Sequence, residues 1–273
     1  MLILDGKLVA NTIETKLAEQ IAQSGKSPKL VIIQVGDNPA SNIYVNMKIK
    51  FGNRIGAQVH VQKFSQDVTQ ETVLEMINFC NTDYEVNGII VQLPLPKNLD
   101  KTLLANAILP EKDVDGLSAI NMAKLVEGDN SGNIPATPKG ILTLLKYYKI
   151  ELDGKNIVVV GRSQLVGLPL SILLVKNSAT VTIAHSHTKN LKDVCKQAEI
   201  LITAVGQPKM FNREYVGENA IVVDVGISKV GNKGVGDVDF ENVEGIVSNI
   251  SPVPGGVGPM TVASLFENLI KNI

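Results

Sequence analysis

The sequence predicts an α/β protein of two domains, each built on a parallel β-sheet that helices cover. Three observations carry this prediction. The chain has 273 residues, the length of about two domains at roughly 150 residues each. Short apolar runs rich in β-formers alternate with longer amphipathic segments, which is the βαβ pattern. The runs are apolar on both faces, as expected of parallel strands that lie between helices.

The predicted strands fall into two series. The first series is LVIIQV (30–35), AQVHVQKF (57–64) and GIIVQL (88–93). The second is NIVVV (156–160), ATVTIA (179–184), EILITA (199–204), AIVVDV (220–225) and GIVSNI (245–250). Turn-forming residues separate the series between 113 and 138. We therefore expect one domain over 1–115 and a second over 116–257, with a last helix, about 258–273, that packs back onto the first.

Composition indicates a soluble globular protein that binds small molecules. Hydrophobic residues make up 44% and charged residues 19%, which suits a large core and argues against disorder. The formal net charge is -1 without a long basic block, so neither nucleic acid nor a membrane surface is an expected partner. Cys80 and Cys195 lie far apart, outside any CxxC or Cys/His cluster, and no leader or membrane span is recognised at the N-terminus. A cytoplasmic protein fits these features.

A glycine turn follows the strand NIVVV. Gly161 ends the strand and a helix is predicted to begin near Leu165, so the turn presents free backbone N–H groups that suit a pyrophosphate. Gly161 and Gly167 are six residues apart, which matches neither G-x-G-x-x-G nor a P-loop. A tight βα turn with a solvated Arg162 explains the same residues equally well when they are taken alone.

The end of the next strand bears on the choice of dinucleotide. NAD-binding sheets place an Asp or Glu there to accept hydrogen bonds from the ribose hydroxyls. Here ATVTIA is followed by HSHT (185–188), which contains no acid. Arg162 and Ser163 supply a cation and a hydroxyl at the first turn, which favours a ribose 2′-phosphate and therefore NADP. The two histidines of HSHT have no third ligand nearby in sequence, so a metal site is not expected.

Polar residues of the first series are predicted to meet at one edge of the sheet. Tyr44 and Lys48 are four apart on a helix that begins near Asp37-Asn38-Pro39, so both lie on one helical face. Gln92 stands near the C-terminal end of GIIVQL, the edge where open α/β sheets bind ligands. Taken singly, a solvated lysine and a half-buried packing tyrosine remain the ordinary alternatives.

Two further segments have a binding and a structural interpretation. Asp113 and Asp115 in KDVDGL do not begin a calcium loop, because Ser118 and Lys124 stand where Gly and Glu are required. A carboxylate here could accept two parallel N–H donors from a heterocycle, or cap the following helix. PVPGGVGPMT (252–261) fits either a ligand-contacting loop or a helix N-terminus.

The order of these motifs resembles the bifunctional methylenetetrahydrofolate dehydrogenase/cyclohydrolase family. The motifs, spread over about residues 30 to 266, are YVNMK, VQLPLP, KDVDG, PATPKG, GRSQLVGLP, HSHT, VDVGI, GDVDF and PVPGGVGPMT. The resemblance implies an N-terminal α/β folate/catalytic domain, a Rossmann-like NADP-binding domain, folate in the cleft and a homodimer. It also implies two reactions, NADP-dependent oxidation of methylenetetrahydrofolate to methenyltetrahydrofolate and hydrolysis of the latter to 10-formyltetrahydrofolate.

Residue roles are also implied by the resemblance. Lys48 would be the catalytic lysine, positioned by Gln92, while Tyr44 stacks on the folate. Asp115 would hold the pterin, with Pro254 and Gly255 near the folate. Around the Gly161 turn, Arg162, Ser163 and Ser186 would hold the 2′-phosphate, and Ile227 would lie near the nicotinamide. Two departures from the family pattern are GENA (217–220), where Lys-Pro-Gly-Ala is frequent, and Ala136, where Cys is common.

Two alternatives stay open at this point. One is another NADP-dependent oxidoreductase on a similar two-domain fold that lacks the hydrolytic step. The other is a folate-binding or regulatory protein without turnover. Assays of NADPH formation and of methenyl hydrolysis separate the three.

Overall fold

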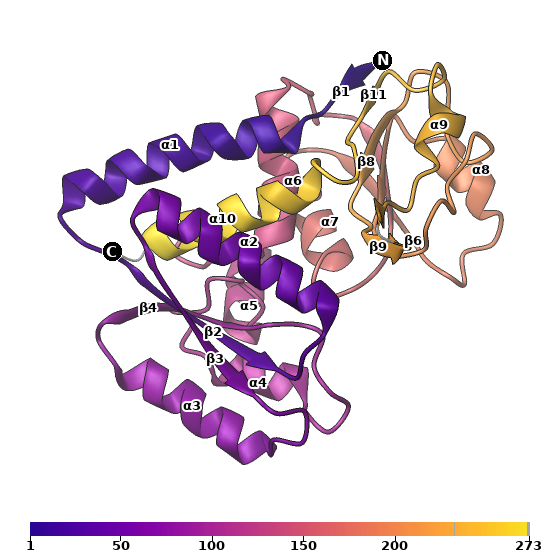
Figure 1. Ribbon diagram of the computed structural model, residues 1–273. Helices are drawn as coiled ribbons and strands as arrows, with labels where there is room; N and C mark the ends of the chain where they lie inside the picture. Colours follow the sequence, from indigo (N-terminus) through magenta and orange to yellow (C-terminus); the bar gives the residue numbers. More distant parts are fainter. Residues whose placement is uncertain (232, 272–273) are drawn as a thin grey trace. The chain divides into compact units, whose positions relative to one another are not determined.

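The computed structural model describes residues 1–231 and 233–271, which fold into two compact units (Figure 1). One unit, called here the three-stranded unit after its sheet, comprises residues 11–136 and the chain from Val262 onward. The other, the six-stranded unit, comprises residues 1–10 and 137–261. The chain changes unit within three helices, α1 (Gly6–Ser24), α6 (Ala136–Tyr147) and α10 (Val257–Lys271). The α/β class predicted from the sequence is confirmed.

The three-stranded unit contains the first predicted series of strands. Its strands β2 (Lys29–Val35), β3 (Gln58–Phe64) and β4 (Val86–Val91) run parallel in the order β3-β2-β4. The helices are α2 (Pro39–Ile55), α3 (Gln70–Thr82), α4 (Lys101–Ala107) and α5 (Ala119–Glu127). Figure 1 shows α2 and α3 on opposite faces of this sheet, which explains why its strands are apolar on both faces. Each strand agrees with its prediction to within two residues.

The six-stranded unit contains the second series. Its sheet has the order β1 (Leu2–Ile3), β11 (Asn249–Ile250), β8 (Ile221–Asp224), β7 (Ile200–Thr203), β5 (Asn156–Val160) and β6 (Thr180–Ala184), and every pair is parallel. Its short elements are α7 (Gly167–Lys176), α8 (Leu191–Lys196), α9 (Phe240–Val243) and the antiparallel pair β9 (Ser228–Val230) and β10 (Lys233–Val235). The strand predicted over 245–250 is wrong in its first four residues, because Gly245 adopts a left-handed φ of 80° that ends α9 in a turn.

The strand order places a topological switch between β5 and β7. From β5 the chain moves outward to β6, and it later returns to β7 on the other side of β5. The loops after β5 and β7 therefore leave the sheet next to each other and run in opposite directions. In open parallel sheets, ligands bind beyond the carboxyl ends of the strands at such a point.

The segment Gly217–Ala220, where the sequence departs from the family pattern, is a tight turn before β8. A Cβ on Gly217 would come within 2.6 Å of the Lys196 carbonyl oxygen, so no larger residue fits without a shift. Asn219 takes a left-handed φ of 61° and its N–H donates to the Ile246 carbonyl at 2.8 Å. A backbone hydrogen bond thus holds the turn, although this chain lacks the proline of the Lys-Pro-Gly-Ala pattern.

Both cysteines are buried and free. Burial raises the pKa of the Cys195 thiol to about 12, so it carries essentially no thiolate at neutral pH. Over the residues that the structure describes, none of the helices combines the length and the apolar character needed to span a membrane.

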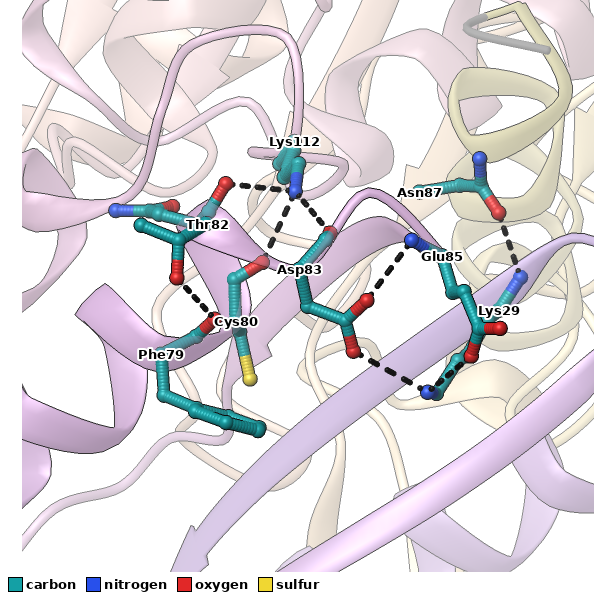
Figure 2. Close-up of polar contacts among 9 residues, drawn as sticks. Lys29, Phe79, Cys80, Thr82, Asp83, Glu85, Asn87 and Lys112 are labelled. Atoms are coloured by element: carbon teal, nitrogen blue, oxygen red, sulfur yellow. Dashed lines mark hydrogen bonds and ion pairs between the residues drawn. The ribbon is translucent and has the colours of Figure 1, made fainter.

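Lys112 closes the C-terminal end of α3 (Figure 2). Its Nζ donates to the carbonyls of Cys80, Asn81 and Asp83 at 2.9, 2.8 and 2.7 Å. Carbonyls at a helix end have no partner within the helix, and a cation there also meets the negative end of the helix dipole. Lys29 makes a weaker contribution next to it, an ion pair with the Asp83 carboxylate at 3.4 Å.

Replacing Lys112 by Met should lower the free energy of unfolding by about 2–4 kcal/mol, because three partly buried carbonyls lose a charged donor. Urea unfolding followed by circular dichroism measures this change. Lys29→Met is the matched control and should cost less, since its two ion pairs, both at 3.4 Å, are longer than the Lys112 hydrogen bonds, and surface pairs contribute little. Equal stability of the two variants would contradict the capping role.

Candidate functional site

Helix α2 carries a buried lysine into the three-stranded unit. Asn38 caps the helix by accepting hydrogen bonds from the N–H groups of Ala40 and Ser41, at 2.9 and 3.2 Å. Two turns further on, Lys48 is only 5% exposed. Its Nζ donates to Gln92 Oε1 at 2.8 Å, so the structure brings together two residues that the sequence places 44 positions apart.

Gln92 is held so that its oxygen faces the lysine. Its backbone N–H donates to the Ile33 carbonyl at 2.9 Å, which extends the sheet just beyond β4. Its side-chain Nε2 donates to the Leu93 carbonyl at 2.7 Å, which leaves Oε1 to accept from Lys48. The same Leu93 carbonyl accepts from Ser41 Oγ at 3.1 Å and so ties the start of α2 to the end of β4. Sequence reasoning missed Ser41, although it lies seven residues before Lys48 on one helical face.

Lys48 and Asp115 influence each other electrostatically. Burial lowers the pKa of the Lys48 ammonium, and the nearby Asp115 carboxylate partly opposes that shift. Burial raises the pKa of Asp115, with Lys48 opposing the rise and Asp113 adding to it. Both groups therefore titrate closer to neutrality than in water, which suits a lysine that accepts and returns a proton.

Asp113 and Asp115 have different surroundings. The Asp113 carboxylate accepts from the N–H groups of Gly116 and Ser118 and from Asn121 Nδ2, at 3.0, 2.8 and 2.9 Å. Helix α5 is capped by Ser118. Within the described part of the chain, the Asp115 carboxylate accepts no hydrogen bond, so it is not the helix cap that the sequence allowed. It keeps its acceptor capacity for a ligand.

Tyr44 precedes Lys48 by one helical turn and is partly buried. Burial raises the pKa of its phenol, so the side chain stays neutral over the physiological range. A partly exposed, neutral ring beside a buried amine can act as a stacking surface for a planar heterocycle.

Beyond β5 in the six-stranded unit, the chain forms a close-packed turn. The Gly161 N–H donates to the Ala184 carbonyl at 2.8 Å, and φ at Gly161 is 131°. A Cβ on Gly161 would lie 2.5 Å from the Ala204 carbonyl oxygen, and one on Gly167 would overlap the Gly161 carbonyl oxygen. These contacts explain why glycines stand at both positions, and α7 begins at Gly167, two residues later than predicted.

The polar residues proposed for a 2′-phosphate lie at the ends of adjacent strands. Arg162 follows β5, is exposed and forms no ion pair with any residue of 1–231 or 233–271. Ser163 Oγ accepts from the Val166 N–H at 3.1 Å, which leaves its own hydrogen free to donate. Ser186, also exposed, lies in the turn after β6, the neighbour of β5. A cation and two hydroxyls at one edge fit a phosphate.

The two histidines beside Ser186 shape this turn. The His187 N–H donates to His185 Nδ1 at 3.2 Å, and the His185 N–H donates to Thr188 Oγ1 at 2.8 Å. No group of three or more potential metal ligands occurs among the residues that the structure describes.

The remaining predicted residues also belong to the six-stranded unit. Ile227 follows β8 and is 47% exposed, which is unusual for an isoleucine at a sheet edge and suits contact with an apolar ligand face. Pro254 and Gly255 follow β11, and the Gly255 carbonyl accepts from the Lys7 N–H at 2.9 Å. The predicted site residues are thus divided between the units, with Tyr44, Lys48, Gln92 and Asp115 in the three-stranded one.

Comparison with known proteins gives full-length matches. Residues 4–115 match the family described as tetrahydrofolate dehydrogenase/cyclohydrolase, catalytic domain, and residues 135–273 match its NAD(P)-binding domain. The bifunctional protein FolD of Agathobacter rectalis is 46% identical over 98% of each chain. The crystal structure of FolD methylenetetrahydrofolate dehydrogenase/cyclohydrolase from Campylobacter jejuni superposes with a TM-score of 0.96 at 43% identity, covering 100% of this chain and 98% of that one. The Trypanosoma brucei FolD complex with NADP cofactor and inhibitor superposes with a TM-score of 0.94 at 34% identity, covering 99% and 97%.

Proposed function

The chain belongs to the tetrahydrofolate dehydrogenase/cyclohydrolase family, and from this premise we propose which of its residues carry out the two reactions. The protein is a bifunctional enzyme of one-carbon metabolism that uses NADP. It oxidises 5,10-methylenetetrahydrofolate to the 5,10-methenyl form and hydrolyses that product to 10-formyltetrahydrofolate. The observation that carries the residue assignment is the buried hydrogen bond from Lys48 to Gln92, close to the carboxylate of Asp115.

The oxidation step requires little acid/base catalysis from the protein. Loss of hydride from the methylene carbon leaves a cation delocalised over two folate nitrogens, so the step chiefly requires alignment with the acceptor. NADP supplies that hydride acceptor when it is bound. The residues of the three-stranded unit contribute by orienting the folate.

Hydrolysis requires proton transfers, and Lys48 is the proposed catalyst. Neutral Lys48 accepts a proton from the water that attacks the methenyl carbon. The ammonium then returns a proton to the folate nitrogen whose bond to that carbon breaks, and the hydroxyl proton of the intermediate leaves to water as the formyl C=O forms. The lowered pKa of Lys48 supports this exchange at neutral pH, and Gln92 holds the amine in place.

Four residues are proposed to bind folate. Tyr44 offers a ring face for stacking, and Asp115 offers two oxygens to neighbouring N–H donors of the pterin. Pro254 and Gly255 are proposed to lie near the folate.

The cofactor contacts are proposed from the sheet edge of the six-stranded unit. The Gly161 turn is proposed to offer backbone N–H groups to the pyrophosphate, while Arg162, Ser163 and Ser186 carry the charge and hydroxyls for the 2′-phosphate. Ile227, which follows β8 two strands away from β5, is proposed to contact the nicotinamide. The 2′-phosphate end of the cofactor is thus assigned to the loops after β5 and β6, and the nicotinamide end to the loop after β8, at the same edge of the sheet.

Domain limits, cellular location and oligomeric state are also proposals. The placement of the last helix in the folate domain is supported by Asn268, whose Nδ2 donates to the Val114 carbonyl at 2.9 Å, and the division at 115/116 is proposed from the turn-forming residues there. A reducing cytoplasm suits two free cysteines. A homodimer that pairs one edge of the six-stranded sheet would cover an apolar side chain exposed there, such as Ile183 on β6. The mass in solution decides the oligomeric state.

Replacing Arg162 by Ala should raise the Michaelis constant for NADP about 10-fold or more, the loss expected when a charge-assisted hydrogen bond disappears. The constant for NAD, which lacks the phosphate, should change little. Initial rates of NADPH and NADH formation measure both. Arg213→Ala, which removes an exposed cation elsewhere in the same unit, is the control. Equal effects on the two cofactors would remove the phosphate assignment.

Replacing Asp115 by Ala should raise the Michaelis constant for folate in both reactions by about 10- to 100-fold, because its carboxylate is proposed to pair with the pterin. Folding should be retained, since Asp115 makes no structural hydrogen bond within the described residues. Asp113→Asn is the matched control and should mainly lower the melting temperature. Unchanged folate affinity in a less stable Asp115→Ala enzyme would mean that the carboxylate is structural.

Replacing Lys48 by Met should impair the two activities unequally. Hydrolysis should fall by about 10²-fold or more, because the general acid/base is lost, while oxidation survives in part. Wild-type hydrolysis should rise with pH through the lowered pKa of Lys48, and the variant should lack that rise.

Methenyl disappearance and NADPH formation are measured separately over a pH series. The Lys48→Met variant leaves Gln92 Oε1 and the Asp115 charge without their buried partner, so it should melt somewhat earlier than wild type, and its melting curve shows that it is folded. Lys50→Met, on the exposed side of α2, controls for the change of residue. Full hydrolysis by the folded variant would refute the assignment, and an equal loss of both activities would make Lys48 a binding residue.

A further inference from the structure

Two buried carboxylates, Asp224 and Asp237, lie in the six-stranded unit and have no part in the roles described so far. Asp224 ends β8 and is 3% exposed, and Asp237 follows β10 and is 0% exposed. Buried carboxylates are costly unless they are well hydrogen-bonded, and two neighbouring ones repel each other. Burial and the proximity of Asp237 raise the pKa of Asp224 to about 7, against the opposing effect of backbone N–H donors.

Asp237 binds the loop that follows β7. Its Oδ2 accepts from the N–H groups of Val205 and Gly206 at 2.7 and 3.1 Å, and its Oδ1 accepts from that of Gln207 at 2.7 Å. Three successive N–H groups therefore converge on one carboxylate. This loop leaves the sheet at the switch between β5 and β7, next to the Gly161 turn.

Asp224 closes the segment that carries Ile227. Its Oδ1 accepts from the N–H groups of Gly226 and Asp237, both at 3.0 Å, and its Oδ2 accepts from that of Val238 at 2.9 Å. The bonds to Gly226 and Val238 join the two ends of the excursion between β8 and α9. Ile227 is the first residue after the closed end.

The surrounding backbone is shaped around both carboxylates. A Cβ on Gly226 would overlap the Asp237 carboxylate, and a Cβ on Gly236 would overlap Asp224 Oδ2. Ser228 Oγ also donates to the Gly206 carbonyl at 3.2 Å, so β9 is linked directly to the loop after β7. The excursion and the loop thus form one hydrogen-bonded assembly.

We propose that Asp224 and Asp237 are positioning residues for hydride transfer, which fix Ile227 and the Val205–Gln207 loop and thereby orient the nicotinamide end of NADP. The inference rests on the proposed placement of Ile227 beside the nicotinamide. The other end of the cofactor is assigned to Arg162 and its neighbours on β5 and β6. Loosening the carboxylate assembly should therefore disturb orientation more than affinity.

The test is Asp237→Asn, which replaces one acceptor oxygen by an NH₂ group that faces backbone donors. The turnover number for oxidation should fall about 10-fold or more, because small misplacements of the reacting atoms slow a reaction by that much. The Michaelis constant for NADP should change little, and hydrolysis of methenyltetrahydrofolate without nucleotide should be unchanged. Substrate deuterated at the methylene carbon should show a larger isotope effect on turnover in the variant, because hydride transfer has become slower.

Two variants serve as controls. Asp239→Asn lies two residues away and removes a carboxylate that pairs with Lys209 at 3.2 Å, so it should leave both activities intact. Ser228→Ala cuts only the link to Gly206, and it should lower turnover in the same direction but less. If Asp237→Asn does not fold, the turnover number of Ser228→Ala decides the test.

Three results would overturn the proposal. In the first, folded Asp237→Asn keeps the wild-type turnover number for oxidation. In the second, its Michaelis constant for NADP rises while its turnover number stays unchanged. In the third, it loses both activities in proportion and also has a lower melting temperature. If the Ser228→Ala variant showed the same turnover number and the same isotope effect as the wild-type enzyme, that result would also count against the proposal. A wild-type enzyme without NADP-dependent oxidation would instead refute the underlying assignment of the cofactor site.

Discussion

The three-stranded unit is organised around an amine kept out of water. Lys48 is tolerated at 5% exposure because Gln92 Oε1 accepts its hydrogen bond and the Asp115 charge lies nearby. The Asn38 cap and the Ser41 bond to the Leu93 carbonyl both serve that geometry, since they fix the start of α2 against the end of β4. If this bond were lost, the buried ammonium would have no neutral acceptor, and the chemistry assigned to it would lose its orientation.

The buried acids of this chain separate into two kinds by what they accept. Asp113, Asp224 and Asp237 each receive two or more backbone N–H groups and so act as cross-links of loops. Asp115 receives none within the described residues and is left with Lys48 as its nearest opposite charge. The three acids that cross-link loops are also almost inaccessible, whereas Asp115 is only partly buried, so hydrogen-bond partners and exposure together distinguish a carboxylate that holds the fold from one available to a ligand.

The sequence predicted what depends on local pattern. Strands such as β5 were found because their apolar runs are long, whereas β1 has only two residues, both exposed, and gives no periodic signal. The meeting of Lys48 with Gln92 followed from helix spacing and from the shared edge of parallel strands. The bonds of Asp237 could not be predicted, because its donors are backbone N–H groups some 30 residues away that no side-chain pattern marks.

The packing of the Gly161 turn restricts how this enzyme can be redesigned. Because any side chain at position 167 would collide with the Gly161 carbonyl, the course of the backbone there cannot be varied without dismantling the turn. Arg162 and Ser186 are by contrast exposed and make no such contact, while Ser163 is exposed but accepts the Val166 N–H. Under the proposed cofactor assignment, retargeting the enzyme from one dinucleotide to another would therefore mean changing these surface side chains while the backbone of the turn stays fixed. A library of variants that randomises positions 162, 163 and 186 and keeps Gly161 and Gly167 would therefore vary the exposed side chains without disrupting the turn.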